Sequence, residues 1–222
     1  MNDNALLNYL QGFITEKRKQ KFEEILSGRT RHFTVVLEDI YQKHNTSAVV
    51  RSCDVFGIQD VHIIENKYKS YLSNQVAKGA EKWLNFHYYR KADNNNVHCI
   101  KTLAKKGYKI IATTPHNDSC FLEDFNISQK SAFVFGVEKE GVSKDILGMA
   151  DGYLKIPMVG FTESLNISVA VAIILQRLTS KLRSSEINWQ LTEKEKNELR
   201  LLWTKRSIKN VEGIIKLLSA RS

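Results

Sequence analysis

Cysteine is scarce in this sequence and forms no recognisable metal-binding or disulfide pattern. Cys53, Cys99 and Cys120 are scattered, no CxxC pair occurs, and no histidine stands at metal-ligand spacing. An odd number of dispersed thiols is typical of a reducing compartment and argues against both a disulfide framework and a zinc site. We therefore expect a cytoplasmic protein with no metal.

Long apolar runs and glycine-rich nucleotide loops are also missing. The longest apolar run, Val169 to Leu175, has seven residues, whereas a membrane helix needs about 20. The N-terminus has no apolar segment typical of a signal peptide. No GxGxxG follows a strand-like segment and no GxxxxGK[ST] is present, so dinucleotide and P-loop enzymes are disfavoured. We expect neither a membrane nor a phosphate-cradling glycine loop.

Positive charge is concentrated at the two ends of the chain. The 222 residues carry a net charge of +9, of which residues 1–31 supply +2 and residues 181–222 supply +5. The length suits one domain with appendages. A nearly neutral centre with basic ends suggests that the ends bind a polyanion, although a solvated helical surface explains the charge equally well.

Strand-like and helix-like segments alternate through the centre of the chain. Apolar, β-rich runs occur at 33–37, 61–65, 109–113 and 132–137, and another strand ends at Pro157. Helical spacing occurs between them, with Asn45 and Ser143 as candidate N-caps. This alternation predicts an α/β fold with a mostly parallel sheet covered by helices on both faces. Residues 66–96 give no clear pattern.

The stretch from Ala132 to Leu178 carries the most informative pattern. Two glycine-bearing loops follow two strands, and the loops at the carboxyl ends of parallel strands are where ligands bind. A long helix then opens with Ser164-Leu165-Asn166 and continues almost wholly apolar, which predicts burial on most sides. For Ser164, helix capping and substrate contact are equally good interpretations.

Both ends are predicted to be helical extensions. Helical spacing runs through residues 4–27 and stops at Gly28, and Thr192 with Glu195 forms a capping box. Ser207 is a candidate cap for a further helix. We expect three segments: an N-terminal helical basic extension over 1–31, a catalytic domain over 32–180 and a basic helical C-terminal extension over 181–222.

Three motifs of this sequence resemble those of a known enzyme family. The segments HNTSAVVRSCDVFG, FGVEKEGVS and IPMVGFTESLNISVA are similar to the motifs of the SpoU (TrmH) branch of the SPOUT RNA 2′-O-methyltransferases. The resemblance runs in order from about Phe33 to Leu178. It implies a deep C-terminal trefoil knot and transfer of a methyl group from S-adenosylmethionine to a ribose hydroxyl.

The resemblance also implies site residues. The family's catalytic positions are matched by Asn45, Arg51, Glu138, Ser164 and Asn166, and its donor-binding positions are matched by Thr113, Gly136, Ile156 and Leu165. Spacing alone predicts that Arg51 makes a surface ion pair with Asp54. The resemblance instead implies that Arg51 activates the ribose 2′-OH. A guanidinium holds its proton too tightly to be a general base, so a charged Arg51 that grips a phosphate and stabilises the alkoxide is the simpler role.

The resemblance also implies an oligomeric state and an RNA substrate. Members form homodimers in which one subunit supplies the donor pocket and the other supplies the arginine. The short helical ends and the segment AKGAEKW are similar to members that methylate guanosine 18 in the tRNA D-loop. Methylation of ribosomal RNA is the alternative substrate. A knotted RNA-binding module without catalysis also stays open, although all polar motif residues are present.

Overall fold

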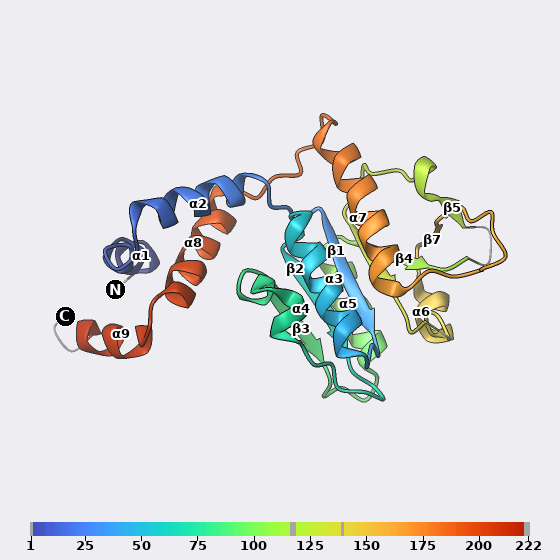
Figure 1. Ribbon diagram of the computed structural model, residues 1–222, viewed down its shortest axis with the longest axis horizontal. Helices are drawn as coiled ribbons and strands as arrows, with labels where there is room; N and C mark the ends of the chain where they lie inside the picture. The colour runs from blue at the N-terminus through green and yellow to red at the C-terminus, as the bar shows by residue number, and fades with distance from the viewer. Residues whose placement is uncertain (1, 116–118, 139, 220–222) are drawn as a thin grey trace. The chain divides into compact units, whose positions relative to one another are not determined.

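The computed structural model describes residues 2–115, 119–138 and 140–219. The chain forms two compact units (Figure 1). The larger unit is Thr30–Trp189, and the smaller combines Met1–Arg29 with Gln190–Ser222. That residues 32–180 hold the catalytic domain stays a prediction.

A seven-stranded sheet forms the centre of the larger unit, with strand order β3-β2-β1-β6-β4-β7-β5 and every neighbouring pair parallel. The strands are β1 (Phe33–Glu38), β2 (Asp60–Ile64), β3 (Asn85–Tyr89), β4 (Lys109–Thr113), β5 (Cys120–Phe121), β6 (Ser131–Phe135) and β7 (Gly152–Lys155). The central strands β1 and β6 are buried along their whole length, as expected for a parallel sheet covered on both faces.

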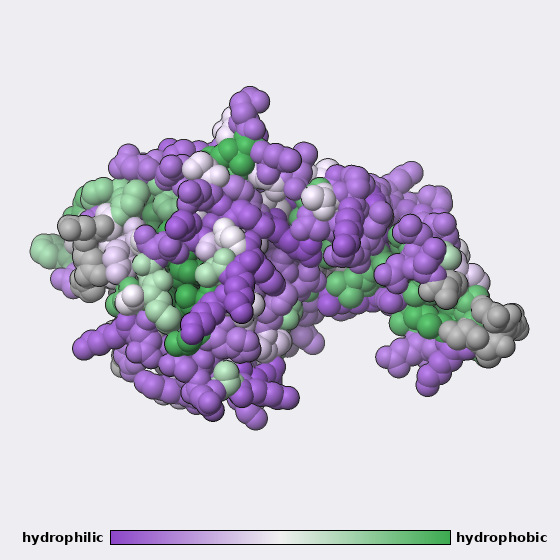
Figure 2. All heavy atoms as spheres, turned by 180° about the vertical axis from the view of Figure 1, so that it is seen from behind, coloured by the Kyte–Doolittle hydropathy of each residue, from purple (hydrophilic) through white to green (hydrophobic). Residues whose placement is uncertain are grey.

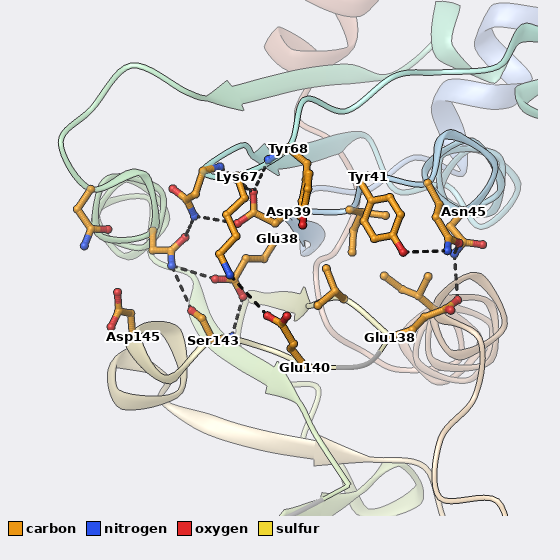
Figure 3. A pocket seen from close by; sticks show the side chains of 18 of the residues that line it. Glu38, Asp39, Tyr41, Asn45, Lys67, Tyr68, Glu138, Glu140, Ser143 and Asp145 are labelled. Carbon is orange, nitrogen blue, oxygen red and sulfur yellow. Dashed lines mark hydrogen bonds and ion pairs between the residues drawn. The ribbon is translucent and has the colours of Figure 1, made fainter.

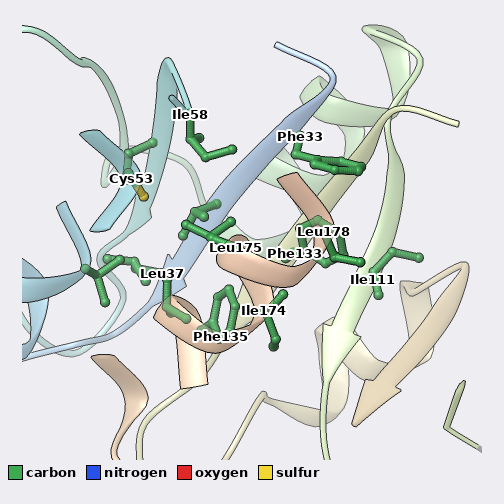
Figure 4. Packing of buried hydrophobic residues seen from close by; sticks show 14 of the residues in the cluster. Phe33, Leu37, Cys53, Ile58, Ile111, Phe133, Phe135, Ile174, Leu175 and Leu178 are labelled. Carbon is green, nitrogen blue, oxygen red and sulfur yellow. The ribbon is translucent and has the colours of Figure 1, made fainter. Parts of the chain in front are cut away.

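Helices pack on both faces of this sheet. Helices α3 (Lys43–Val55) and α7 (Ile167–Arg183) cover the face that carries Phe133 and Phe135 (Figure 4). Helices α5 (Asn95–Lys105) and α6 (Lys144–Met149) cover the opposite face, which carries Ala132 and Val134. Successive side chains of a strand point to opposite faces, so β6 supplies both cores. The predicted α/β architecture is confirmed.

Several predicted element boundaries were wrong. Helix α3 begins at Lys43 with Gln42 at its N-cap, so Asn45 lies inside the first turn. Helix α7 begins at Ile167 and is capped by Asn166, not by Ser164. Ser143 does cap α6, as predicted. Strands β3 and β5 lie in stretches that gave no strand signal, and the first of these stretches also holds the short helix α4 (Asn74–Ala77).

Helix α7 is less buried than its composition predicted. Val169 and Ile173 are 45% and 38% exposed, although the opposite side of the helix is in the core. The face seen in Figure 2, opposite to that of Figure 1, is mostly hydrophilic, with apolar side chains in patches on both units.

The smaller unit is helical, as predicted for the two extensions. It contains α1 (Asp3–Gln11), α2 (Glu16–Ser27), α8 (Glu193–Ser207) and α9 (Val211–Ser219). The capping box of Thr192 and Glu195 is present at α8. Ser207 is the last residue of α8 and does not cap α9. Trp203 is buried and packs edge-to-face on Phe22, with ring centroids 5.5 Å apart.

None of the helices within the described residues has the length and apolar character that crossing a membrane requires. The trefoil knot stays a prediction of the resemblance.

Candidate functional site

Three predicted site residues meet at the carboxyl edge of the sheet. Asn45 Nδ2 donates to Glu138 Oε1 at 3.0 Å, Asn166 Nδ2 donates to the same oxygen at 2.6 Å, and Asn166 Nδ2 lies 3.1 Å from Asn45 Oδ1. Figure 3 shows the Asn45–Glu138 contact at one end of a pocket. The three residues are separated by up to 121 positions in the chain. We call them the polar cluster.

Asn166 links the polar cluster to the start of α7. Its Oδ1 accepts from the backbone N–H and the hydroxyl of Ser168, at 2.9 and 2.6 Å, and so caps the helix. Its amide nitrogen points the other way, to Asn45 and Glu138. One side chain therefore sets the helix start and holds the carboxylate, which orients the cluster before any substrate arrives.

One pocket beside the cluster collects the predicted donor-binding residues. Its lining, which we call the Thr113 pocket, includes Thr113, Gly136, Ile156, Ser164 and Leu165. It encloses about 130 Å³ at the ends of β4, β6 and β7. The structure thus brings all four predicted donor residues together, with Ser164 beside them.

Gly136 is required by the close approach of two backbone segments. A Cβ built on Gly136 would lie 1.9 Å from the carbonyl oxygen of Gly141. The N–H of Gly141 donates to the carbonyl of Val137 at 2.8 Å, which closes the turn that carries Glu138. Because any side chain at 136 would push this turn open, the glycine fixes both the pocket wall and the carboxylate.

A second, larger pocket lies on the other side of the cluster and was not predicted. This Tyr41 pocket encloses about 630 Å³, within the range of small-molecule sites. Loops after β1, β2, β3 and β6 line it, with Asp39, Tyr41, Lys67, Tyr68 and Glu140 among its residues (Figure 3). Its signals in the sequence were the adjacent acids at the end of β1 and Glu140, the second acid of the motif FGVEKEGVS.

The floor of the Tyr41 pocket is held by two acidic residues. Glu38 is buried and accepts from Asn96 Nδ2 and from the backbone N–H of Ser143, both at 2.9 Å. Burial raises the pKa of Glu38, and these hydrogen bonds act in the opposite direction. Asp39, at φ 53°, accepts from the backbone N–H groups of Asn66 and Lys67 at 2.7 and 2.8 Å. These contacts fix the loop that carries Lys67.

Arg51 does not join the polar cluster. It is exposed on α3, and the described residues offer its side chain no hydrogen bond and no ion pair, so the predicted pair with Asp54 is not formed. Six residues of helix place Arg51 about 9 Å along the axis from Asn45 and on a different side. It lines neither pocket. Within one chain, Arg51 is therefore separate from the other predicted catalytic residues.

The described residues contain no group of three or more His, Cys, Asp or Glu side chains arranged to hold a metal ion. Cys53, Cys99 and Cys120, all within the described residues, form no disulfide.

The motifs and the geometry agree with a comparison to known protein families. The model of the SpoU rRNA Methylase family matches residues 32–176. The chain belongs to this family. It is 42% identical over 222 residues to the tRNA (guanosine(18)-2′-O)-methyltransferase of Borreliella burgdorferi, covering 99% of this chain and 100% of the relative. A relative of the same name from Thermus thermophilus is 35% identical over 72% of this chain and 81% of its own length.

Solved SpoU structures share the fold. The Aquifex aeolicus TrmH/SpoU tRNA modifying enzyme superposes with a TM-score of 0.78 and 27% identity, over 88% of this chain and 98% of its own. The SpoU methyltransferase AviRb from Streptomyces viridochromogenes, solved in complex with AdoMet, gives a TM-score of 0.61 at 21% identity, over 73% and 62%. The second likeness concerns the fold alone. The predicted membership of the SpoU branch is confirmed.

Proposed function

We propose that this protein transfers a methyl group from S-adenosylmethionine to a ribose 2′-OH in RNA, and that its substrate is guanosine 18 of tRNA. The observation that carries the proposal is the meeting of Asn45, Glu138 and Asn166 beside the Thr113 pocket in a SpoU-family chain. The position of the nucleotide is supported by the names of relatives that match this chain over most of its length. The cytoplasm is the proposed place of action, because cysteines outside disulfides are typical of a reducing compartment.

The Thr113 pocket suits the donor chemically. Ile156 and Leu165 supply apolar walls, and the backbone around Thr113 and Gly136 supplies hydrogen-bonding groups. When bound, S-adenosylmethionine supplies an electrophilic methyl group. The cavity is smaller than most ligand sites, so we expect the loop over 158–165, where Phe161 is fully exposed, to shift outward to admit the whole donor.

The polar cluster would position the ribose. Both amide donors of the cluster go to Glu138 Oε1, and the described residues offer no hydrogen bond to Oε2. That second oxygen would accept a hydrogen bond from the ribose hydroxyl and hold it in line for the displacement. Asn45 and Asn166 keep the carboxylate from rotating, so they act through Glu138.

Arg51 would come from a second copy of the chain. Arg51 lines neither pocket of its own chain. Its helix, α3, packs against α7, and both helices expose apolar side chains. These are Val55 on α3, which is 67% exposed, and Val169 and Ile173 on α7. A homodimer that covers these positions can carry the Arg51 guanidinium to the partner's polar cluster, where it would bind a phosphate and stabilise developing negative charge.

Methyl transfer to defined RNA tests the proposal. Purified protein is incubated with S-adenosylmethionine and an unmodified tRNA transcript, and the digested RNA is read by nucleoside mass spectrometry. We expect 2′-O-methylguanosine at position 18, with a rate about 100-fold or more lower in Arg51→Ala. Lys101→Ala, which removes an exposed charge from α5, should match the wild type.

Two other outcomes separate the alternatives. Methylation of ribosomal RNA, with none on tRNA, would keep the chemistry and reject the substrate. Donor binding without methylation of any RNA would instead support a non-catalytic RNA-binding module.

A further inference from the structure

The Tyr41 pocket adjoins the proposed methylation site but holds none of the donor-binding residues. It shares Val137, Glu138, Gly141 and Ile167 with the Thr113 pocket, so the two cavities meet at the polar cluster. If the ribose lies at this cluster, as proposed above, the donor occupies one side and the other side is open to the rest of the nucleotide. The natural occupant of the larger cavity is therefore the base attached to that ribose.

Two tyrosines give this pocket a stacking surface. Tyr41 and Tyr68 are 54% and 48% exposed, and their ring centroids lie 5.2 Å apart with the planes tilted by 50°. In Figure 3 they lie between the Asn45–Glu138 contact and the Lys67–Glu140 pair. Proteins that recognise unpaired RNA stack the bases on exposed aromatic side chains in this way.

Beyond the tyrosines, a donor and an acceptor stand side by side. Lys67 Nζ lies 3.7 Å from Glu140 Oε2, and both side chains are well exposed, at 67% and 75%. An exposed pair of this kind contributes little stability, so a ligand can replace the contact at small cost. The surrounding acids Asp39 and Glu38 repel an anionic phosphate. An uncharged base is therefore the ligand that fits this pocket better.

The pair matches the Watson–Crick edge of guanine. Guanine offers two adjacent donors, N1–H and N2–H, beside the acceptor O6. A carboxylate can accept from both donors at once while an ammonium donates to O6. Adenine, cytosine and uracil do not present two adjacent N–H donors on this edge. None of them can therefore donate to both oxygens of one carboxylate while it accepts from the ammonium.

The loop that carries Lys67 is positioned before any ligand binds. Asp39 accepts from the backbone N–H groups of Asn66 and Lys67, and Asn66 Nδ2 donates to Asn96 Oδ1 at 2.8 Å. A prepared contact surface lowers the entropy cost of binding.

We propose that the Tyr41 pocket receives the target nucleobase, unstacked from its RNA, and that Glu140 and Lys67 read it as guanine. The inference rests on the proposed function and deepens it, because it assigns the choice of nucleotide to residues outside the polar cluster. Tyr41 and Tyr68 would hold the base, the polar cluster would hold its ribose, and Glu140 would accept from N1–H and N2–H.

Replacement of guanosine 18 by inosine tests the role of Glu140, because inosine lacks only the N2 amino group. With wild-type protein, kcat/KM should fall about tenfold from guanosine to inosine, which is the effect of one hydrogen bond to a charged group. Glu140→Gln should lower kcat/KM for guanosine by a similar factor and bring the guanosine-to-inosine ratio close to one. Glu186→Gln, which changes an exposed acid outside both pockets, should keep the wild-type ratio.

The outcomes separate the two proposals. A wild-type protein that methylates no RNA would reject the proposed function. If the wild type is active and Glu140→Gln keeps its ratio of kcat/KM for guanosine to kcat/KM for inosine, the proposed recognition of the base is rejected. The proposed methylation is then unaffected.

Photocrosslinking provides a second measurement that needs no turnover. RNA with 6-thioguanosine at position 18 is bound to the full chain, irradiated and mapped by peptide mass spectrometry. Attachment to the peptides that contain Tyr41 or Tyr68 is expected. Attachment solely to peptides outside the Tyr41 pocket would overturn the proposal whatever the activity.

Discussion

At the scale of single residues, Asn166 combines two functions that substitution can separate. Its Oδ1 caps α7, and its Nδ2 donates to Glu138. In Asn166→Ser the cap is kept and the donor to Glu138 is lost, whereas Asn166→Ala loses both. We expect Asn166→Ala to lower the free energy of unfolding by about 1 kcal/mol and Asn166→Ser to lower it much less.

Both variants should lose methyl transfer by about tenfold or more, because the carboxylate then lacks its closest donor. Urea denaturation and single-turnover methylation measure the two effects separately. Full activity in Asn166→Ser would show that the amide does not position Glu138 for the reaction.

At the scale of elements, the paired strands β2 and β3 contain a histidine whose titration should control acid stability. Burial, with smaller contributions from His87 and Lys106, lowers the pKa of His62 to about 3, although Asp60 acts in the opposite direction. The His62 ring is stacked on His87 at 4.5 Å, and its Nδ1 lies 2.9 Å from the Tyr89 hydroxyl.

In the unfolded chain this histidine titrates near its ordinary pKa of 6.5. Below that pH the unfolded state therefore binds a proton that the folded state does not bind. Stability should therefore fall as the pH drops from 7 towards 3, by about 2 kcal/mol between pH 7 and pH 5 from this group. His62→Gln should remove this part of the pH dependence. The exposed His44→Gln should keep it. The free energy of unfolding is measured by urea denaturation at each pH. If it falls with pH equally in both variants, the role of His62 is contradicted.

The elements also show where sequence reasoning succeeds. Strands β1, β4 and β6 are continuous apolar runs, because a central parallel strand is buried on both faces, and all three were predicted. Strand β3 lies at the sheet edge with mostly half-buried residues, and β5 has two residues, so neither produces an apolar run. Helix starts were misplaced where several capping residues compete, as Ser164 and Asn166 do at α7.

The candidate site also has parts that the sequence predicted and parts that it did not. The motifs place Asn45, Glu138 and Asn166 together through the resemblance alone, since 93 and 121 residues separate Asn45 from the other two. The Tyr41 pocket has no contiguous motif, because its walls come from loops after four different strands whose adjacency only the sheet order reveals. The resemblance implied that the arginine comes from the other subunit, and helix geometry separates Arg51 from the polar cluster within one chain.

At the scale of the whole molecule, the separation of Arg51 from the pockets makes a prediction about two copies of the chain. If each site combines the pockets of one chain with Arg51 of the other, two different inactive variants can restore one another. Arg51→Ala keeps its pockets intact. Gly136→Ala keeps Arg51 but loses its Thr113 pocket, because the new Cβ would collide with Gly141. A mixed dimer then contains one complete site and one site with both defects.

Co-expression of the two variants with different affinity tags, followed by purification through both tags, isolates the mixed dimers. We expect them to have about half the methyl-transfer activity of the wild type, and each variant alone to have almost none. Gly148→Ala, at a helical glycine whose added Cβ meets nothing within 4 Å, is the matched control and should be fully active alone. If Arg51 acts within its own chain, the mixed dimers will be as inactive as the separate variants, because neither chain then holds both the arginine and an intact pocket.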